Sequence, residues 1–228
     1  MHRTHLVLVL CLPLLAEALR FPAFVSKKPA AAVALRDALL ASAGAGGTDG
    51  DAAVGGRDAL MALVESCCQA RVPFDGKLLT DGGLWRATPI RGATPRWQRN
   101  RLLLPLLNNR AGQAYYADAT VVNYGEVLGR LVYFKAEGTF ERASASVGAN
   151  RCPVDFDVSI ARGGAVVGGL ELLTEGISGP GYLRVRYIDE DIRIFESPKS
   201  SPGEWEEQGL IVVQVRDALF DDPVGAGI

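Results

Sequence analysis

The side chains most used in enzyme catalysis are few in this chain, and they do not cluster. The only two histidines, His2 and His5, precede an apolar run near the N-terminus. If that run is removed as a leader, imidazole bases, catalytic triads and histidine-ligated zinc or haem are excluded. Carboxylates, lysine, tyrosine or cysteine would have to carry any remaining catalysis. We therefore predict no enzyme activity, no metal site and no cofactor.

The four cysteines do not show the spacing of a metal site or a disulfide framework. Cys11 would leave with the leader. Cys67 and Cys68 are neighbours and could close only a strained vicinal bridge, and pairing either with Cys152 would leave an odd thiol. We interpret the three as small buried hydrophobic residues. One redox-active thiol is the alternative.

Two groups of charged residues could act on a ligand. Asp155 and Asp157 share one face of an expected strand, as paired acid and base carboxylates would, although acidic residues alternating with apolar ones also describe a half-exposed strand, which we favour. Arg184 and Arg186 share a face in the same way, either as exposed outer residues or as an anchor for a ligand headgroup. Asp189 begins an acidic cluster that either caps a turn or, at a barrel mouth, orients a polar end group.

The N-terminus of the chain has the pattern of a targeting signal. Residues 6–15 form an apolar stretch after Arg3, and Ala16-Glu17-Ala18 supplies small residues at a cleavage point. This pattern predicts a signal peptide over residues 1–18, because a membrane span needs about 20 apolar residues.

Residues 19–56 resemble a transit peptide followed by a Gly/Ala-rich linker. The stretch from Arg20 to Arg36 contains no acidic residue, residues 29–43 are rich in alanine, and residues 44–56 are rich in glycine. Signal plus transit peptide is the bipartite address of algae whose plastid lies inside the secretory system, so we predict a plastid protein. A plain secreted protein is the alternative.

The body of the chain is predicted to be mainly β, with one short amphipathic helix before it. Leu60, Leu63, Val64 and Cys67 follow helical spacing over residues 57–70. Alternating apolar residues then predict strands, with no helix between them. The expected strands are 84–88, 119–123, 131–135, 139–143, 154–160, 165–173, 183–187, 192–195 and 211–215.

Such a run of strands fits either a closed antiparallel barrel or a sandwich. The tripeptide Gly83-Leu84-Trp85 at the first strand favours a lipocalin-like barrel whose narrow end the tryptophan closes. The formal net charge of -2 argues against a nucleic-acid partner. No stretch of the body is long and apolar enough for a transmembrane segment, so we expect none.

The segment GYLRVRYIDEDIR at residues 181–193 resembles the C-terminal signature of the plastid lipid-associated proteins, the fibrillins. The opening around Trp85, the segment from Gln113 to Asn123 and Val154-Asp155-Phe156 follow in family order. The resemblance covers residues 57–217 and leaves 218–228 as a C-terminal tail. Ile188 and Ile192 replace the family's leucines, and residues 198–208 lengthen the last hairpin.

The resemblance implies a lipocalin-like barrel at plastoglobules or thylakoids, or in the stroma, that binds hydrophobic molecules such as prenyl lipids, quinones or carotenoids. The alternatives are a plastoglobule surface or adaptor protein that docks lipid-metabolic enzymes without enclosing a ligand, and a barrel enzyme using Asp189. The expected cavity lining is Leu131, Tyr133, Phe156, Val158, Val185 and Tyr187. The candidate ligand-binding residues are Asp189, Trp85, Tyr133, Phe156, Val185, Tyr187 and Arg193. Residues 102–107, with five leucines, are the preferred lipid-contacting loop.

Overall fold

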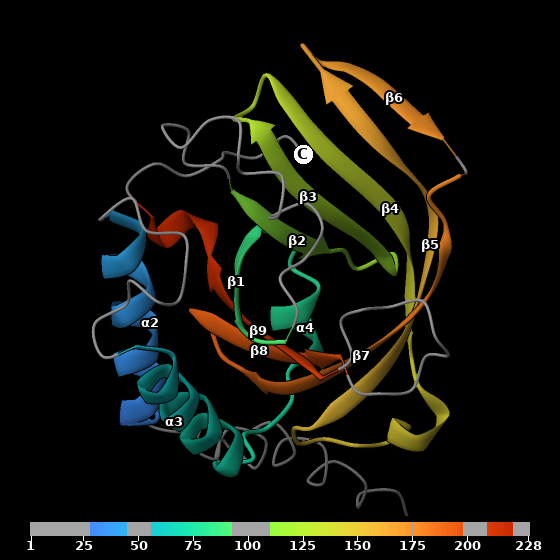
Figure 1. Ribbon diagram of the computed structural model, residues 1–228. Helices are drawn as coiled ribbons and strands as arrows, with labels where there is room; N and C mark the ends of the chain where they lie inside the picture. Colours follow the sequence, from blue (N-terminus) through green and yellow to red (C-terminus); the bar gives the residue numbers. More distant parts are fainter. Residues whose placement is uncertain (1–27, 45–55, 93–109, 175, 198–208, 221–228) are drawn as a thin grey trace, which may run out of the picture.

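A computed structural model describes residues 28–44, 56–92, 110–174, 176–197 and 209–220 (Figure 1). The strands are β1 (Trp85–Arg91), β2 (Ala111–Tyr115), β3 (Thr120–Leu128), β4 (Val132–Arg142), β5 (Val154–Val167), β6 (Leu170–Thr174), β7 (Gly179–Ile188), β8 (Ile192–Ser197) and β9 (Leu210–Arg216). The helices are α2 (Ala30–Gly44), α3 (Gly56–Gln69) and α4 (Gly76–Leu79). Two short 3-10 turns cover Ser144–Ser146 and Asp217–Leu219.

The strands form an antiparallel barrel that closes on itself. Their order is β4-β3-β2-β1-β9-β8-β7-β5-β6, and the pairing of β4 with β5 completes the circle through eight strands. The long strand β5 pairs with β7 along its first half and with β6 along its second half. β6 therefore extends one side of the barrel as a flap, which is visible at the top of Figure 1. The predicted mainly β, lipocalin-like barrel is confirmed.

The two ends of the barrel differ in their coverage. We call one end the closed end. It contains the start of β1, the end of β9 and the turn between β7 and β8. The segment leading into α4 packs against this end, with Leu79 buried in the same apolar cluster as Phe156 and Val185. At the opposite end, the open end, β1 ends, β9 begins and the β4–β5–β6 flap continues outward.

Strand boundaries differ from the sequence-based expectation at glycines. The two strands expected at residues 131–135 and 139–143 are one continuous strand, β4 (Val132–Arg142), whose register with β5 shifts between Glu137 and Gly138. A Cβ at Gly138 would come within 2.1 Å of the Ser159 carbonyl oxygen, so only glycine fits there. Conversely, Gly168 and Gly169, with φ of 57° and 86°, turn the chain inside the expected strand 165–173. The short strand β2 was not predicted.

The helix predicted over residues 57–70 is confirmed as α3, with Leu60, Val64 and Cys67 buried. The structure departs from the predicted transit peptide and linker at residues 30–44, which form α2. Leu35 and Leu39 of α2 are buried against α3 and the barrel. Burying a leucine contributes about 1.5–3 kcal/mol, so α2 belongs to the folded body.

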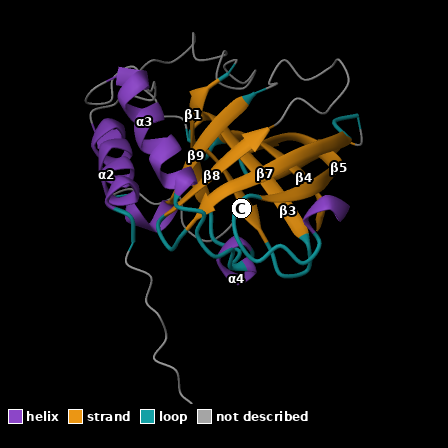
Figure 2. Cartoon of the chain, turned by 90° about the horizontal axis from the view of Figure 1, so that it is seen from below, coloured by secondary structure: helices purple, strands orange, loops and turns teal. Residues whose placement is uncertain are grey.

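The helices α2 and α3 lie side by side against the outer face of β8 and β9 (Figure 2). Ile192 and Ile194 of β8, and Ile211, Val213 and Val215 of β9, contact this layer. The apolar residues of β9 therefore point outward under the helices, and the residues between them point into the barrel. Both faces of these strands are buried, which explains their nearly continuous apolar sequence.

Ion pairs hold α2 to the closed end. Lys28 Nζ and Arg36 Nη1 each lie 2.6 Å from Asp191 Oδ2, in the turn between β7 and β8. Burial alone would raise the pKa of the Asp191 carboxyl, but the hydrogen bonds from Lys28 and Arg36 outweigh it and hold that pKa below its usual value. The carboxylate is therefore ionised at neutral pH.

The described cysteines are free thiols, and Cys67 and Cys152 are buried. Burial raises the pKa of both thiols to about 12 and that of Cys68 to about 11. They are thus protonated at physiological pH, as the prediction of small buried hydrophobic residues requires.

Candidate ligand-binding site

Trp85 is the first residue of β1, at the closed end, and its side chain is 0% exposed. The guanidinium of Arg216 lies 4.2 Å from the ring centroid, and that of Arg193 lies 4.7 Å from it. Arg216 is held in place by the carboxylate of Asp81 and the carbonyl of Glu190. The tryptophan therefore stacks with one arginine at the barrel end and with a second arginine that comes from β8.

Arg193 is a fully buried cation inside the barrel. Its guanidinium lies 4.7–5.0 Å from the ring centroids of Trp85, Tyr115 and Phe195. The Nε donates to Gln214 Oε1 at 2.5 Å, and Nη2 donates to the Gln113 carbonyl at 2.9 Å. Within the described part of the chain, Nη1 has no hydrogen-bond partner and no carboxylate forms an ion pair with this arginine.

Burial is the main cause of an unusual protonation equilibrium at Arg193. It lowers the pKa of the guanidinium to about 9, while Tyr115 and Asp81 act in the opposite direction. The value stays above neutral pH, so the group is charged in the folded protein. Contacts with the aromatic faces offset part of the cost of burying this charge.

A ladder of amide side chains crosses the barrel interior from Arg193. Gln214 Nε2 donates to Gln113 Oε1 at 2.8 Å, and Gln113 Nε2 donates to Asn123 Oδ1 at 2.7 Å. Cross-strand partners project to the same face of a sheet, so the register Trp85–Gln113–Asn123–Ala136 follows the inner wall. Gln113, Asn123 and Ala136 are partly exposed.

Aromatic side chains fill one part of the interior, next to the closed end, and we call this part the closed half. The Tyr115 ring lies 4.9 Å from Phe140 and 5.9 Å from Phe195, and Phe140 lies 5.8 Å from Phe156. Val185 is fully buried in the same cluster. Phe156 and Val185 therefore face inward, as predicted, but they lie in a packed core.

The rest of the interior, which we call the open half, is lined by smaller side chains that solvent reaches. These inward-facing residues are partly exposed: Ala87, Ala136, Val158, Ile160, Leu183 and Val212. Val158, Ile160 and Leu183 also pack against the aromatic cluster, so they lie where the two halves meet. Their inward direction follows from their register with buried core positions, such as Phe195 opposite Val212 and Phe156 opposite Leu183. The open half is thus apolar and accessible.

The same inner face continues onto the flap. Ala136 is followed two residues away by Phe134, which pairs with Ala165, and Ala165 pairs with Leu172 of β6. Phe134 is 42% exposed and Leu172 is 53% exposed. Val167 and Leu170 form the next exposed pair along this face. An apolar surface therefore runs from the open half onto the flap.

Two predicted cavity residues lie outside the barrel interior. Tyr133 occupies the position next to the inward-facing Phe134, and its ring packs against Tyr124 on the outer face at a centroid distance of 4.9 Å. Tyr187 packs beneath α2 and α3 with Ile194. An irregularity between Val185 and Tyr187 shifts the register, so the alternation that placed both inside fails.

Leu131, a third predicted lining residue, lies at the turn between β3 and β4 and is 63% exposed. Turn residues do not follow the alternation of the strand, which explains this error. The predicted lipid-contacting loop at residues 102–107 lies outside the described residues. Val158 is the remaining predicted lining residue; it is partly exposed and packs against the aromatic cluster opposite Phe140.

Asp189 lies in the turn between β7 and β8, at the closed end rather than at a barrel mouth. Its carboxylate accepts hydrogen bonds from the Tyr187 hydroxyl at 2.8 Å and from the backbone amides of Asp191 and Ile192 at 2.8 Å and 2.9 Å. Lys28 Nζ is 3.7 Å away. These contacts support the alternative interpretation, a carboxylate that caps a turn.

The other predicted charged residues form ion pairs on the outer face. Arg184 Nε lies 2.7 Å from Asp155 Oδ1, and Arg186 Nη2 lies 3.0 Å from Glu65 Oε2 on α3. The exposed Asp157 lies outside this pair. The paired-carboxylate arrangement is therefore not formed, and neither arginine reaches the barrel interior.

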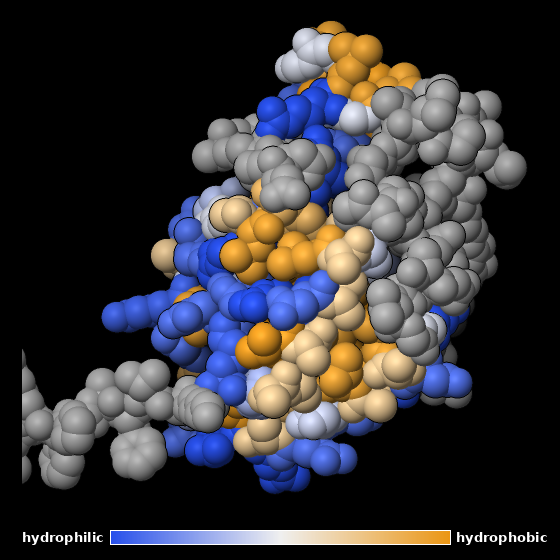
Figure 3. Space-filling model, turned by 90° about the vertical axis from the view of Figure 1, so that its left-hand side faces the viewer, coloured by the Kyte–Doolittle hydropathy of each residue, from blue (hydrophilic) through white to orange (hydrophobic). Residues whose placement is uncertain are grey.

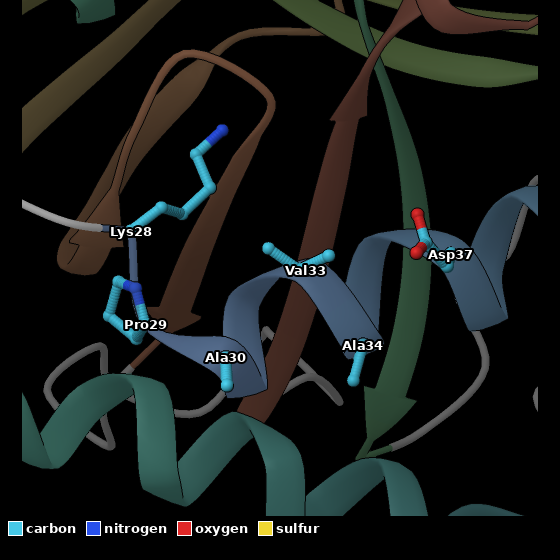
Figure 4. A pocket seen from close by; sticks show the side chains of 6 residues that line it. All are labelled: Lys28, Pro29, Ala30, Val33, Ala34 and Asp37. Carbon is cyan, nitrogen blue, oxygen red and sulfur yellow. The ribbon is translucent and has the colours of Figure 1, made fainter.

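A shallow hollow lies outside the barrel, along the exposed side of α2. Its lining consists of Lys28, Pro29, Ala30, Val33, Ala34 and Asp37. Figure 4 shows that these side chains are spread along the helix and do not converge on one point. Figure 3 shows the side of the molecule on the left of Figure 1, where apolar and hydrophilic surface alternate.

The residues that sequence reasoning missed are the amides Gln113 and Gln214 and the small residue Ala136. Gln214 lies among valines on β9, and Arg193 lies between isoleucines on β8. A single polar residue inside an otherwise apolar strand was the available signal for both. The roles of Ala136 and Ala87 depend on which face of the barrel they occupy, and the sequence does not reveal that face.

No family model, curated protein or solved structure matches the chain. Among the described residues, no helix has the length and hydropathy needed to cross a membrane. Within the same residues, no group of three or more His, Cys, Asp or Glu side chains is placed to hold a metal ion. What the protein binds is therefore inferred from the geometry of its barrel.

Proposed function

We propose that this protein is a carrier that holds an apolar small molecule in the open half of its barrel. The observation that supports the proposal most directly is the continuous inner face that runs from Ala136 through Phe134 to Leu172. This face is apolar and partly exposed. Covering such a surface with a ligand contributes about 25 cal/mol for each Å² of apolar area removed from water.

We further propose that the chain is a plastid lipid-associated protein of the fibrillin type and that its ligands are prenyl lipids, quinones or carotenoids. The support for this assignment is the sequence resemblance at residues 181–193. The leader over residues 1–18 and the basic segment that follows it support delivery to a plastid, with plastoglobules, thylakoids or the stroma as the final location. The start of α2 at Ala30 favours a processing site before Lys28, because cleavage beyond it would remove a helix of the core.

A surface or adaptor protein is the second candidate, and one specific observation favours it. Leu131, in the turn between β3 and β4, is 63% exposed, and Leu170, the first residue of β6, is 66% exposed. Exposed leucines at loop tips can insert into a lipid surface without any enclosed ligand. This candidate predicts that a lipid droplet, and no single molecule, is bound.

The two candidates are separated by a substitution that fills the open half. The full chain, the Ala136→Trp variant and the control Glu141→Trp would each be incubated with phylloquinone or β-carotene and re-isolated by gel filtration. Glu141 lies on the same strand but is exposed on the outer face. The carrier proposal predicts about one bound ligand per chain for the wild type and for Glu141→Trp, and little for Ala136→Trp.

Equal retention by all three proteins would contradict a site in the open half. If none retained ligand but all floated with lipid droplets, the adaptor candidate would replace the carrier.

A further inference from the structure

The interior of the barrel holds two hydrogen-bond donors without an acceptor. Arg193 Nη1 and Trp85 Nε1 are both buried, and neither has a partner among the described residues. The two side chains are in contact, since the Arg193 guanidinium lies 4.7 Å from the centroid of the indole ring. Buried polar groups are nearly always hydrogen-bonded, so a pair of unmet donors in one place points to a missing acceptor.

The missing acceptor should carry negative charge. An unpaired buried cation is costly, and aromatic contacts compensate only in part. Asp81 is the acidic residue that acts on Arg193, and its carboxylate is already bound to Arg216. Gln214 and Gln113 contribute neutral oxygens only. No described side chain neutralises Arg193.

This cation is buried, and hydrogen bonds link it to residues of the proposed ligand site. Arg193 Nη2 donates to the carbonyl of Gln113, a residue that is itself partly exposed in the open half. Arg193 also pairs in register with Gln214, and Gln214 pairs with Ala87, another partly exposed inward residue. An anionic group that entered the open half would meet this ladder first and could then reach the guanidinium.

We propose that the bound ligand is a long-chain carboxylic acid whose carboxylate accepts from Arg193 and Trp85 while its chain extends along the open half toward Phe134 and Leu172. Two donors match the two oxygens of a carboxylate. The inference rests on the proposed carrier function and refines its ligand class. The headgroup site does not depend on Asp189, which faces the turn at the closed end.

Ligands of equal chain length test the headgroup separately from the tail. Binding of palmitate, 1-hexadecanol and hexadecyl phosphate to the full chain would be measured by isothermal titration calorimetry. The variants are Arg193→Met and Trp85→Phe, and the control is Arg184→Met, which removes an arginine on the outer face that has Asp155 as its partner. Thermal unfolding followed by circular dichroism would show that each variant is folded.

The wild type and Arg184→Met should bind palmitate roughly tenfold to a hundredfold more tightly than 1-hexadecanol, the range expected for charge-assisted hydrogen bonds. Arg193→Met should lose this preference while it still binds 1-hexadecanol. Trp85→Phe should reduce the preference by a smaller factor, and it remains informative if Arg193→Met does not fold.

Equal binding of palmitate and 1-hexadecanol by the wild type would overturn the headgroup site while leaving the carrier function intact. Tighter binding of hexadecyl phosphate than of palmitate would overturn the assignment to a carboxylate. If no C16 ligand bound and phylloquinone also failed, the carrier function itself would be contradicted.

Discussion

The closed and open halves of the barrel are built from the same strands but differ in the size of their inward side chains. Aromatic residues fill the closed half, namely Trp85, Tyr115, Phe140, Phe156 and Phe195. In the open half the corresponding positions include Ala87, Ala136 and Gly163. Protein interiors are close-packed, so large residues complete one half and small residues leave the other accessible.

Under the proposed carrier function, this difference places stability and ligand binding in different parts of one sheet. Stability comes from the closed half and from the outer layer where α2 and α3 cover β8 and β9. The open half can then present apolar surface to a ligand without weakening the fold. Arg193 lies at the boundary of the two halves, where a buried charge is supported on one side by aromatic rings and reached from the other by the ladder of amides.

The largest expected effect is on the free energy of unfolding, which should depend on whether a phenylalanine lies in the closed half or on the flap. Phe156→Ala, in the closed half, should lower the free energy of unfolding by about 3–5 kcal/mol, because it leaves a cavity in a packed core. Phe134→Ala, on the exposed flap, should lower it by less than about 1 kcal/mol. Urea unfolding curves measure both, and equal losses would break the distinction between the halves.

Phe134 on the flap should matter more for ligand affinity than for stability. Phe134→Ala removes apolar area from the proposed tail path, so we expect the dissociation constant for palmitate to rise about tenfold. Val147→Ala, an exposed residue outside this face, serves as the control. If Phe134→Ala binds palmitate as tightly as the wild type, the flap does not contact the ligand.

A smaller effect is expected at Tyr187, beneath the helices. Tyr187→Phe removes the hydrogen bond to Asp189 and should cost about 1 kcal/mol of unfolding free energy. It should leave ligand affinity unchanged, because Tyr187 lies on the outer face. If Tyr187→Phe lowers ligand affinity without lowering stability, Tyr187 lines the ligand site, and its placement on the outer face is wrong.

The smallest effect concerns pH and the attachment of α2. The pKa of Asp191 is lowered in the folded protein, so its ion pairs stabilise the fold above the unfolded-state pKa of about 3.9 and are lost as pH falls through the lower folded value. We expect a loss of at most about 1 kcal/mol that Asp191→Asn abolishes. Hydrogen exchange of α2 amides between pH 3 and pH 6 would detect it.

Hydrophobic alternation was sufficient to predict the barrel, because most strands have one face inside and one outside. It failed at Tyr187, because a register shift after Val185 turns the Tyr187 side chain to the outer face. It also failed at Leu131, which lies in the turn before β4. The helix α2 was missed because its composition matches a transit peptide, although Ala32, Leu35 and Leu39 already had helical spacing. The composition of residues 30–44 does not reveal that this segment packs against α3 and the barrel.

The candidate site was only partly predictable. Trp85 and Arg193 were identified from motifs, and the structure brings them into contact. The pairing of Gln113 with Gln214 joins residues far apart in the chain, which no local pattern reveals. For Asp189 the sequence left two roles open, a turn cap or a position at a barrel mouth, because it does not indicate which end of the barrel a turn occupies.

The most direct test of the account is a heteronuclear NMR titration of the full chain with palmitate. We predict chemical-shift changes for the inward residues Ala87, Ala136, Val158 and Val212, with little change for Ile192 and Val213 under the helices. Shift changes confined to the surface of α2, or no changes at all, would contradict a ligand site in the open half of the barrel.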